Sequence, residues 1–228
     1  KIDSVAVDGT RNVLEAARAA KVQRVVHVSS VTALNGSERP EVFDETATYS
    51  LGGKNLHYSF AKHKAEQVVL GFGAEGMDVV IASPAEVYGP DDDAMVTAGN
   101  LLDILHASPP AACDGGTSIA HVDDVADGVI AALFRGRRGE RYILGGENLS
   151  LHDLMEKVIT LAGRRASIVD IPNAAAVRLC HLMSEAGLNP PIPLDVLDYA
   201  TMYWFVDSKK AQRELGYRPR SADDTLKP

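Results

Sequence analysis

Short apolar runs rich in β-branched residues alternate along the chain with longer segments in which apolar positions recur every three or four residues. The first pattern predicts buried strands, and the second predicts amphipathic helices. Strands are expected at residues 24–30, 78–83, 117–122, 141–146 and 166–172. Helices are expected at residues 8–20, about 54–72, 94–107, 124–134 and 151–163, and near 207–217 after a region of proline-interrupted helices.

Polar residues at the starts of these segments are expected to cap the helices, because their side chains can accept hydrogen bonds from unpaired backbone N–H groups. The expected caps are Asp8 or Thr10, Asp123 or Asp124, and Ser150. The acidic run at residues 91–93 is interpreted as a solvated loop rather than a cation site, since no fourth ligand is within reach in the sequence.

Strands that alternate with helices of ten or more residues indicate parallel βαβ units. The predicted fold class is therefore α/β, with a doubly wound parallel sheet. The pattern changes in the proline-rich region between Pro172 and Pro193, which favours a smaller, mostly helical C-terminal lobe. We expect this lobe to supply an apolar substrate pocket or to pack as a core. Its candidate residues are Met95, Leu102, Leu105, Met183, Leu194, Tyr203, Trp204 and Phe205.

The composition is that of an ordinary globular protein, with 46% apolar and 24% charged residues among 228. A net charge of −8 argues against nucleic acid as a partner, because nucleic acid needs a basic surface. No apolar run approaches the roughly 18 residues of a membrane span, and no signal peptide is recognisable. Cys113 and Cys180 are interpreted as buried thiols in a cytoplasmic protein, and the histidines have no metal-binding spacing.

The sequence GFGAEG at residues 71–76 has the spacing of a dinucleotide-binding loop. In such a loop a strand comes first and a helix follows, so that the pyrophosphate meets the start of the helix. Here a predicted helix precedes Gly71 and a predicted strand follows Gly76, which is the reverse order. We therefore interpret these glycines as the end of a helix and a turn.

The segment YSFAK places Tyr58 and Lys62 four residues apart, on one face of a predicted helix. An ammonium near a phenol favours the phenolate and lowers the phenol's pKa, so this pair can act in proton transfer. Ser30 ends the predicted strand at 24–30, and active sites of open parallel sheets lie beyond the carboxyl ends of the strands. Ser30 could therefore hydrogen-bond a substrate oxygen while Tyr58 gives or takes its proton.

An ordered set of segments resembles the extended short-chain dehydrogenase/reductases, also called the NAD-dependent epimerase/dehydratase family. They are VDGTRNVLEAARAAKVQRVVHVSS, YSFAKHKAEQVV, VVIASPAEVYGPDD, HVDDVADGV and DSKKAQRELGYRP, which together extend over nearly the whole chain. Within the family, RGRRGERYILGGENLSLHDLM looks most like the dihydroflavonol-reductase-like branch, which includes hopanoid-associated proteins described as sugar epimerases.

The resemblance implies a Rossmann-like sheet and an NAD(P)-dependent oxidoreductase of carbonyls or secondary alcohols. It implies that Tyr58 is the general acid/base, that Lys62 lowers its pKa and holds the nicotinamide ribose, and that Ser30 orients the substrate. The other implied cofactor contacts are Ser29, Pro84, Ala85 and Val87, and the implied substrate contacts are Thr32 and Glu86. NADP is slightly favoured over NAD, and no metal is expected.

The resemblance also implies a division of the chain. Residues 1–90 and 116–146 would belong to the dinucleotide-binding domain, and residues 91–115 and 147–228 to the substrate lobe. The family's glycine-rich loop would lie upstream of Lys1. The expected partners are a small-molecule substrate and a second copy of the chain, which would form a homodimer through the helices at 8–20 and 54–72.

Two alternatives remain open at this point. One is a nucleotide-sugar epimerase or dehydratase of the same family. The other is a non-catalytic Rossmann-like protein that senses a dinucleotide, because Ala6 and Ser83 stand where the family usually has Asn and often has Arg.

Overall fold

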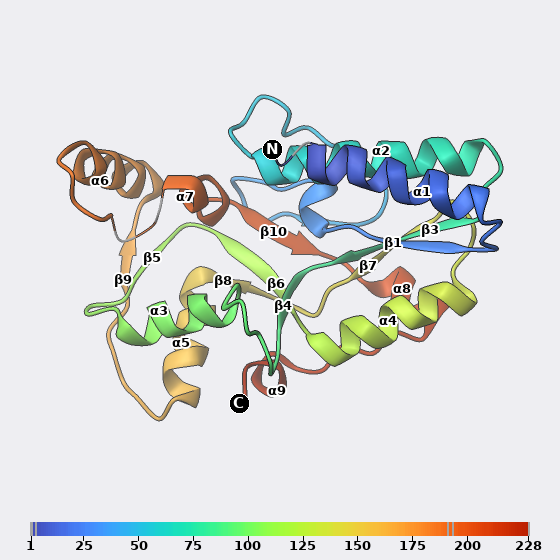
Figure 1. Ribbon diagram of the computed structural model, residues 1–228. Coiled ribbons are helices and arrows are strands. Elements are labelled where there is room, and N and C mark those ends of the chain that lie inside the picture. Colours follow the sequence, from blue (N-terminus) through green and yellow to red (C-terminus); the bar gives the residue numbers. More distant parts are fainter. Residues whose placement is uncertain (1, 3, 191, 193, 228) are drawn as a thin grey trace.

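The computed structural model describes residues 2, 4–190, 192 and 194–227. One sheet consists of three parallel strands in the order β1 (Val25–Val28), β3 (Val79–Pro84) and β7 (Arg141–Leu144) (Figure 1). The register pairs Val28 with Ala82 and Pro84 with Leu144. Because the strands are parallel, the segments that follow β1 and β3 leave the sheet at the same edge.

Helices cover both faces of this sheet. On one face lie α1 (Gly9–Ala19) and α2 (His57–Ala74), and on the other lie α4 (Val122–Arg135) and α8 (Lys209–Leu215) (Figure 1). Successive residues of β3 enter different cores: Val79 and Ile81 pack with α1 and α2, whereas Val80 and Ala82 pack with α4 and α8. This alternation confirms the predicted doubly wound α/β arrangement.

The strand β1 is less buried than we expected from its apolar sequence. All six residues of β3 are buried, but those of β1 are half-buried or exposed, and Val28 is 47% exposed. In the described part of the chain β1 pairs with β3 alone and is the end strand of its sheet. A strand in that position lacks the cover that a neighbour on its other edge would give.

A second sheet lies beyond the carboxyl ends of the strands of the first sheet. Its strands run in the order β2 (Val42–Phe43), β10 (Tyr203–Val206), β6 (Gly116–His121) and β4 (Glu86–Tyr88), with β8 (Glu147–Ser150) antiparallel to β6. Of these five strands only β6 was predicted. The strand β10 alternates in burial, so that Trp204 and Val206 are buried while Tyr203 and Phe205 contact each other on the other face.

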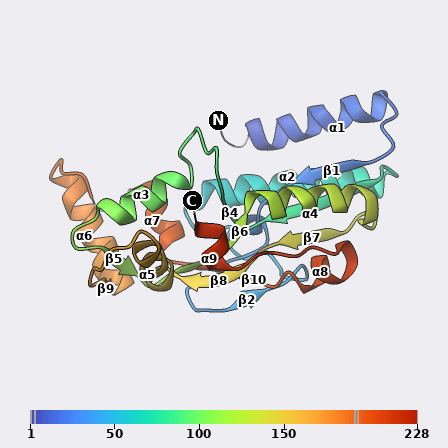
Figure 2. The ribbon, with the colours of Figure 1, turned by 90° about the horizontal axis from the view of Figure 1, so that it is seen from below.

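The C-terminal lobe lies at one end of the molecule, away from α1 and α8, in both views (Figures 1 and 2). Its helices are α3 (Ala98–His106), α5 (Leu151–Leu161), α6 (Asn173–Glu185) and α7 (Leu194–Ala200). A two-stranded parallel sheet of β5 (Ala111–Cys113) and the predicted strand β9 (Val169–Ile171) joins them. The last helix, α9 (Ala222–Leu226), packs against β6.

Two of the predicted helix caps are wrong. A π-helical turn, Ser4–Asp8, runs into α1, so Asp8 already has helical backbone angles and its side chain makes no capping bond, while Thr10 lies inside the helix. At α4 the cap is His121, whose Nδ1 accepts a hydrogen bond from the backbone nitrogen of Asp123 at 3.1 Å. Asp124 instead binds the guanidinium of Arg220 from the end of the chain.

The other local interpretations hold. The hydroxyl of Ser150 accepts a hydrogen bond from the backbone nitrogen of Asp153 at 3.0 Å and caps α5. Asp92 in the acidic loop accepts hydrogen bonds from the backbone nitrogens of Thr97 and Ala98, both at 2.9 Å, where α3 begins. The glycines of residues 71–76 end α2 before β3, and Gly76 turns the chain with a φ of +108°.

A buried ion pair joins α2 to the sheet. The carboxylate of Glu66 on α2 is fully buried and pairs with the guanidinium of Arg141 on β7, and the hydroxyl of Ser83 on β3 donates to the same carboxylate at 3.5 Å. Tyr58, Lys62 and Glu66 are spaced four residues apart on α2 and therefore lie on one face of the helix. The pair thus orients that face toward the strands.

We predict that Arg141→Met lowers the free energy of unfolding by about 3–5 kcal/mol, because it leaves the buried charge of Glu66 without a partner. Urea unfolding followed by circular dichroism measures this change. Arg18→Met is the matched control, since the Arg18–Glu75 pair is exposed and is expected to contribute less than about 1 kcal/mol. Equal losses in the two variants would contradict a structural role for the buried pair.

Candidate active site

Ser30 follows β1 directly, and local hydrogen bonds fix its side chain. Its hydroxyl accepts hydrogen bonds from the backbone nitrogen of Thr32 at 3.2 Å and from the hydroxyl of Thr32 at 2.9 Å. These bonds cap the short 3-10 helix Val31–Ala33. The short helix that follows Ser30 packs against α2, and Tyr58 in the first turn of α2 lines the same cavity as Ser30.

Tyr58 lies in the first turn of α2, and Lys62 follows one turn later. The Nζ atom of Lys62 is 5.7 Å from the centroid of the Tyr58 ring. The start of the helix is held by Ser59, whose hydroxyl donates to the backbone oxygen of Thr32 at 2.8 Å and whose backbone nitrogen donates to the phenol oxygen of Tyr199 at 3.1 Å. The geometry therefore brings together the three residues that the sequence singled out for proton transfer.

The electrostatics differ from our expectation for Tyr58. The pKa of its phenol is raised from the ordinary value, because burial disfavours the phenolate, and the hydrogen bond from Ser30 opposes this effect only in part. Burial also lowers the pKa of the Lys62 amine, while the negative charge of Glu66 raises it. The predicted lowering of the tyrosine pKa is therefore wrong for this structure.

Tyr58 lies between two cavities and lines both. A cavity of about 560 Å³ lies between the sheet and the C-terminal lobe, and a second of about 590 Å³ lies beside the starts of α1 and α2. Among the residues predicted from the sequence, the first cavity is lined by Ser30, Thr32, Tyr58, Ala85, Glu86 and Val87. The second is lined by Tyr58 and Lys62, together with His27 and Val28 of β1.

Two predicted cofactor contacts, Ser29 and Pro84, line neither of these cavities. Pro84 belongs to β3 and pairs with Leu144 of β7 in the sheet. The Oγ atom of Ser29 is buried without a hydrogen-bond partner in the described structure. Of the eight apolar residues proposed for the pocket, Trp204 alone lines the first cavity. Its neighbours Tyr203 and Phe205 point to the other face of β10, because side chains alternate between the faces of a strand.

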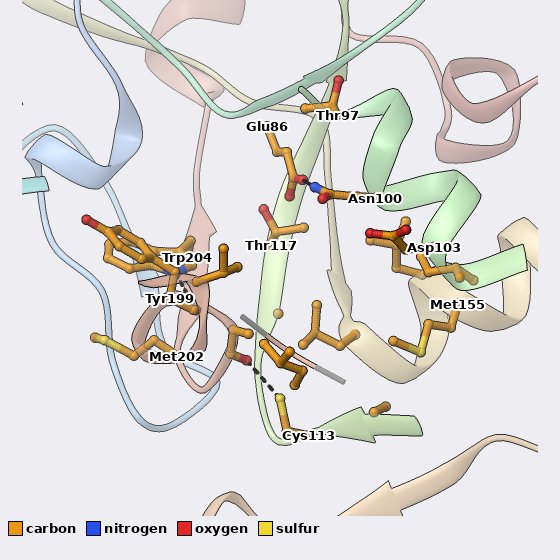
Figure 3. A pocket seen from close by; sticks show the side chains of 18 of the residues that line it. Glu86, Thr97, Asn100, Asp103, Cys113, Thr117, Met155, Tyr199, Met202 and Trp204 are labelled. Atoms are coloured by element: carbon orange, nitrogen blue, oxygen red, sulfur yellow. Dashed lines mark hydrogen bonds between the residues drawn. The ribbon is translucent and has the colours of Figure 1, made fainter. Parts of the chain in front are cut away.

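A polar cluster in the first cavity was not anticipated in full. The Oε1 atom of Glu86 accepts hydrogen bonds from the hydroxyl of Tyr88 at 2.8 Å and from the amide of Asn100 at 3.2 Å. Figure 3 shows the side chains of Glu86 and Asn100 meeting at one end of the cavity, with Thr97 nearby. Tyr88 and Glu86 are two apart on β4 and could have been linked by strand periodicity, but Asn100 comes from α3.

Comparison with known proteins decides the family. Residues 3–145 match the NAD dependent epimerase/dehydratase family, which is more than half of the chain. The chain belongs to this family. No helix among the described residues has both the length and the apolar character to cross a membrane.

Three relatives illustrate the range of the family. A Synechocystis sp. protein with the name "Putative dihydroflavonol 4-reductase" is 31% identical over 96% of this chain. The 4-hydroxy-2-methyl-3-oxo-4-farnesyl-3,4-dihydroquinoline-1-oxide ketoreductase of Stigmatella aurantiaca is 32% identical over 93% of it. A nucleoside-diphosphate-sugar epimerase from Pseudomonas aeruginosa has a similar structure, with a TM-score of 0.81 and 28% identity over 99% of this chain and 71% of its own. The Rossmann-like fold class is thereby confirmed.

The chain covers 66% of each of the two curated relatives. It therefore spans slightly less than two thirds of their length.

An NAD(P) cofactor is implied by the family, and the second cavity has features that fit one. Lys62 and Tyr58 both line it. The buried Nε2 atom of His27, which also lines it, has no hydrogen-bond partner in the described structure. Buried polar atoms without partners are costly, and a polar ligand would satisfy them.

His27 gives this region a testable pH dependence. Its pKa is lowered to about 4, first because it is buried and second because the positive charge of Lys62 is close. As the pH falls from 6.5 to about 4, His27 takes up a proton in the unfolded chain but not in the folded chain. The protein is therefore expected to lose stability as the pH falls through this range.

We predict that lowering the pH from about 7 to about 4 costs about 3 kcal/mol through His27 alone, and that His27→Leu removes this part of the loss. Urea unfolding at a series of pH values measures it. His152→Gln serves as the control. Asp170 raises the pKa of this exposed histidine, so removing the histidine should not make the loss of stability at low pH shallower. An unchanged slope in His27→Leu would show that His27 titrates normally.

Proposed function

We propose that this protein is an NAD(P)-dependent oxidoreductase that reduces a carbonyl or oxidises a secondary alcohol, with Ser30, Tyr58 and Lys62 as its catalytic residues. The observation that carries the proposal is that Tyr58 lines both cavities. A phenol in this position can reach a substrate in the first cavity and a cofactor in the second. Ser30 lines the first cavity together with Tyr58 and supplies a second hydroxyl there.

In the direction of reduction, Ser30 donates a hydrogen bond to the carbonyl oxygen of the substrate, and Tyr58 gives its proton to that oxygen as it gains negative charge. The phenol is protonated near neutral pH, because the ordinary pKa of tyrosine is far above neutral and burial raises it further. The ammonium of Lys62 then stabilises the phenolate that remains. NAD(P)H, when bound, supplies the hydride that adds to the carbonyl carbon. Oxidation of an alcohol reverses the proton transfer.

The finer assignments rest on the resemblance to the family. Lys62 would hold the ribose next to the nicotinamide, and Ala85 and Val87, which line the first cavity, would contact the ring. Contacts from Ser29 and Pro84, which line neither cavity, stay predictions. NADP is favoured over NAD. The homodimer through α1 and α2 and the proposed division into a dinucleotide domain and a substrate lobe stay predictions.

The similarity to the Pseudomonas aeruginosa epimerase supports a second candidate, a nucleotide-sugar epimerase. An epimerase oxidises and re-reduces one carbon, so it would form product without net change in cofactor absorbance. The proposed oxidoreductase would consume or form reduced cofactor in proportion to product. A protein that binds NADPH or NADH saturably but converts neither class of substrate would be the non-catalytic alternative.

The first measurement is a fluorescence titration with NADPH and with NADH, for which we expect saturable binding and a lower Kd for NADPH. We then predict that Tyr58→Phe lowers kcat for reduction of a neutral ketone by about 100- to 10,000-fold, because the proton donor is lost. The rate is followed by the absorbance of the reduced cofactor. The Kd of the cofactor should change by less than about threefold, since the ring is kept.

Tyr217→Phe is the matched control. It also removes a tyrosine hydroxyl, one that is buried without a partner in the described structure and lies in the core between α4 and α8. Its kcat should stay near that of the parent protein. Near-normal turnover in Tyr58→Phe would overturn the assignment of the proton donor, and absence of binding to either cofactor would overturn the proposed function.

A further inference from the structure

The first cavity has mainly apolar walls. Tyr199, Met202 and Trp204 form one side, and Met155 lies across from them, as Figure 3 shows. Leu154 of α5 and Ile104 of α3 add further apolar surface. A volume of about 560 Å³ is enough for a small organic ligand with a sizeable apolar body.

The charges in this cavity have one sign. Among the described residues that line it, none is lysine, arginine or histidine, and two are acidic, Glu86 and Asp103. A nucleoside diphosphate would bring further negative charges into the same space. Burying an unpaired charge is strongly unfavourable, and like charges add repulsion to that cost. The cavity is therefore a poor site for the diphosphate of a nucleotide sugar.

The carboxylate of Glu86 is arranged to accept one more hydrogen bond. Both of its protein donors, Tyr88 and Asn100, bind Oε1, so neither occupies Oε2. The neighbouring Thr97 donates to the backbone oxygen of Val87 at 2.7 Å and does not compete for the carboxylate. Glu86 is half-buried and lines the cavity together with Tyr58. A ligand hydroxyl inside the cavity is a suitable donor for Oε2.

We propose that the substrate is an uncharged, mainly apolar ketone or secondary alcohol with a second hydroxyl group, and that Glu86 accepts a hydrogen bond from this second hydroxyl. The inference rests on the proposed function for the position of the reacting carbon, which lies at Tyr58. It adds the chemical class of the substrate and makes Glu86 a specificity-determining residue. The same charges disfavour nucleotide sugars, the substrates of the second candidate function.

The chain offers a direct reporter of binding. Trp204 is its single tryptophan and lines the cavity, where its indole nitrogen donates to the backbone oxygen of Tyr199 at 3.0 Å. We would titrate the protein, without cofactor, with linear 2-ketones of about eight to twelve carbons that do or do not carry a terminal hydroxyl. The same protein would be titrated with UDP and UDP-glucose, with calorimetry as a second readout.

We expect saturable changes in Trp204 emission with the ketones and none with UDP or UDP-glucose. At the best chain length the hydroxyl should tighten binding by about tenfold, as expected for a hydrogen bond to a charged group. In Glu86→Gln this gain should fall to about twofold, whereas Asp103→Asn, which changes the other acidic residue of the cavity, should keep it. Trp204→Phe should abolish the fluorescence signal but not the calorimetric one.

Two outcomes would overturn the inference. One is binding of UDP-glucose that displaces the ketones, and the other is a hydroxyl preference that is the same in Glu86→Gln as in the parent. Because these titrations need neither cofactor nor turnover, they are independent of the test of Tyr58. Ketone binding with the predicted preference but no turnover would count against the proposed function and leave the assignment of the cavity intact.

Discussion

The buried carboxylate of Glu66 governs the geometry around it. It lies on the same face of α2 as Tyr58 and Lys62, and its pairing with Arg141 of β7 turns this face toward the sheet. Without a partner, a charge at a fully buried position would be expelled or neutralised. The ion pair therefore couples the packing of the helix to the position of the phenol at its start. Stability and chemistry depend on the same contact.

Tyr58 is reached from two sides, and each side has its own chemistry. Toward the C-terminal lobe the walls are apolar and the charges are negative. Toward α1 and β1, the amine of Lys62 and the buried imidazole of His27 line the space. Both cavities are mainly apolar, and they differ in the charges that line them, with Glu86 and Asp103 in the first and Lys62 in the second. Such a division suits a reaction in which two different ligands meet at one phenol.

The phenol illustrates how burial competes with charge. The spacing of Tyr58 and Lys62 led us to expect a lowered pKa, and the fold instead produces a raised one. An ammonium 5.7 Å from the ring centroid does not compensate for the removal of water around the phenol oxygen. A raised pKa makes the phenol a weaker acid, so it gives up its proton only as negative charge develops on the acceptor oxygen. The proton affinity of this phenol therefore depends on packing as well as on residue spacing.

The sequence by itself determined the alternation of strands and helices, the end of α2 at the glycines of residues 71–76, and the clustering of Ser30 with Tyr58. These features depend on local periodicity, on turn residues, and on the rule that parallel strands end at one edge. Only the tertiary structure decided the strands β2, β4, β5, β8 and β10, which form by pairing with segments that are distant in the sequence.

The tertiary structure also decided which polar groups meet. The cap of α4 by His121, the Asp124–Arg220 pair and the Glu66–Arg141 pair join residues whose partners cannot be chosen from the local sequence. The contact of Glu86 with Asn100 likewise joins β4 to α3. Local sequence determines the longer helices and the strands of the first sheet, since the signals for these elements lie close together in the chain. Long-range packing determines the charges and cavities, since these depend on side chains that only the folded chain brings together.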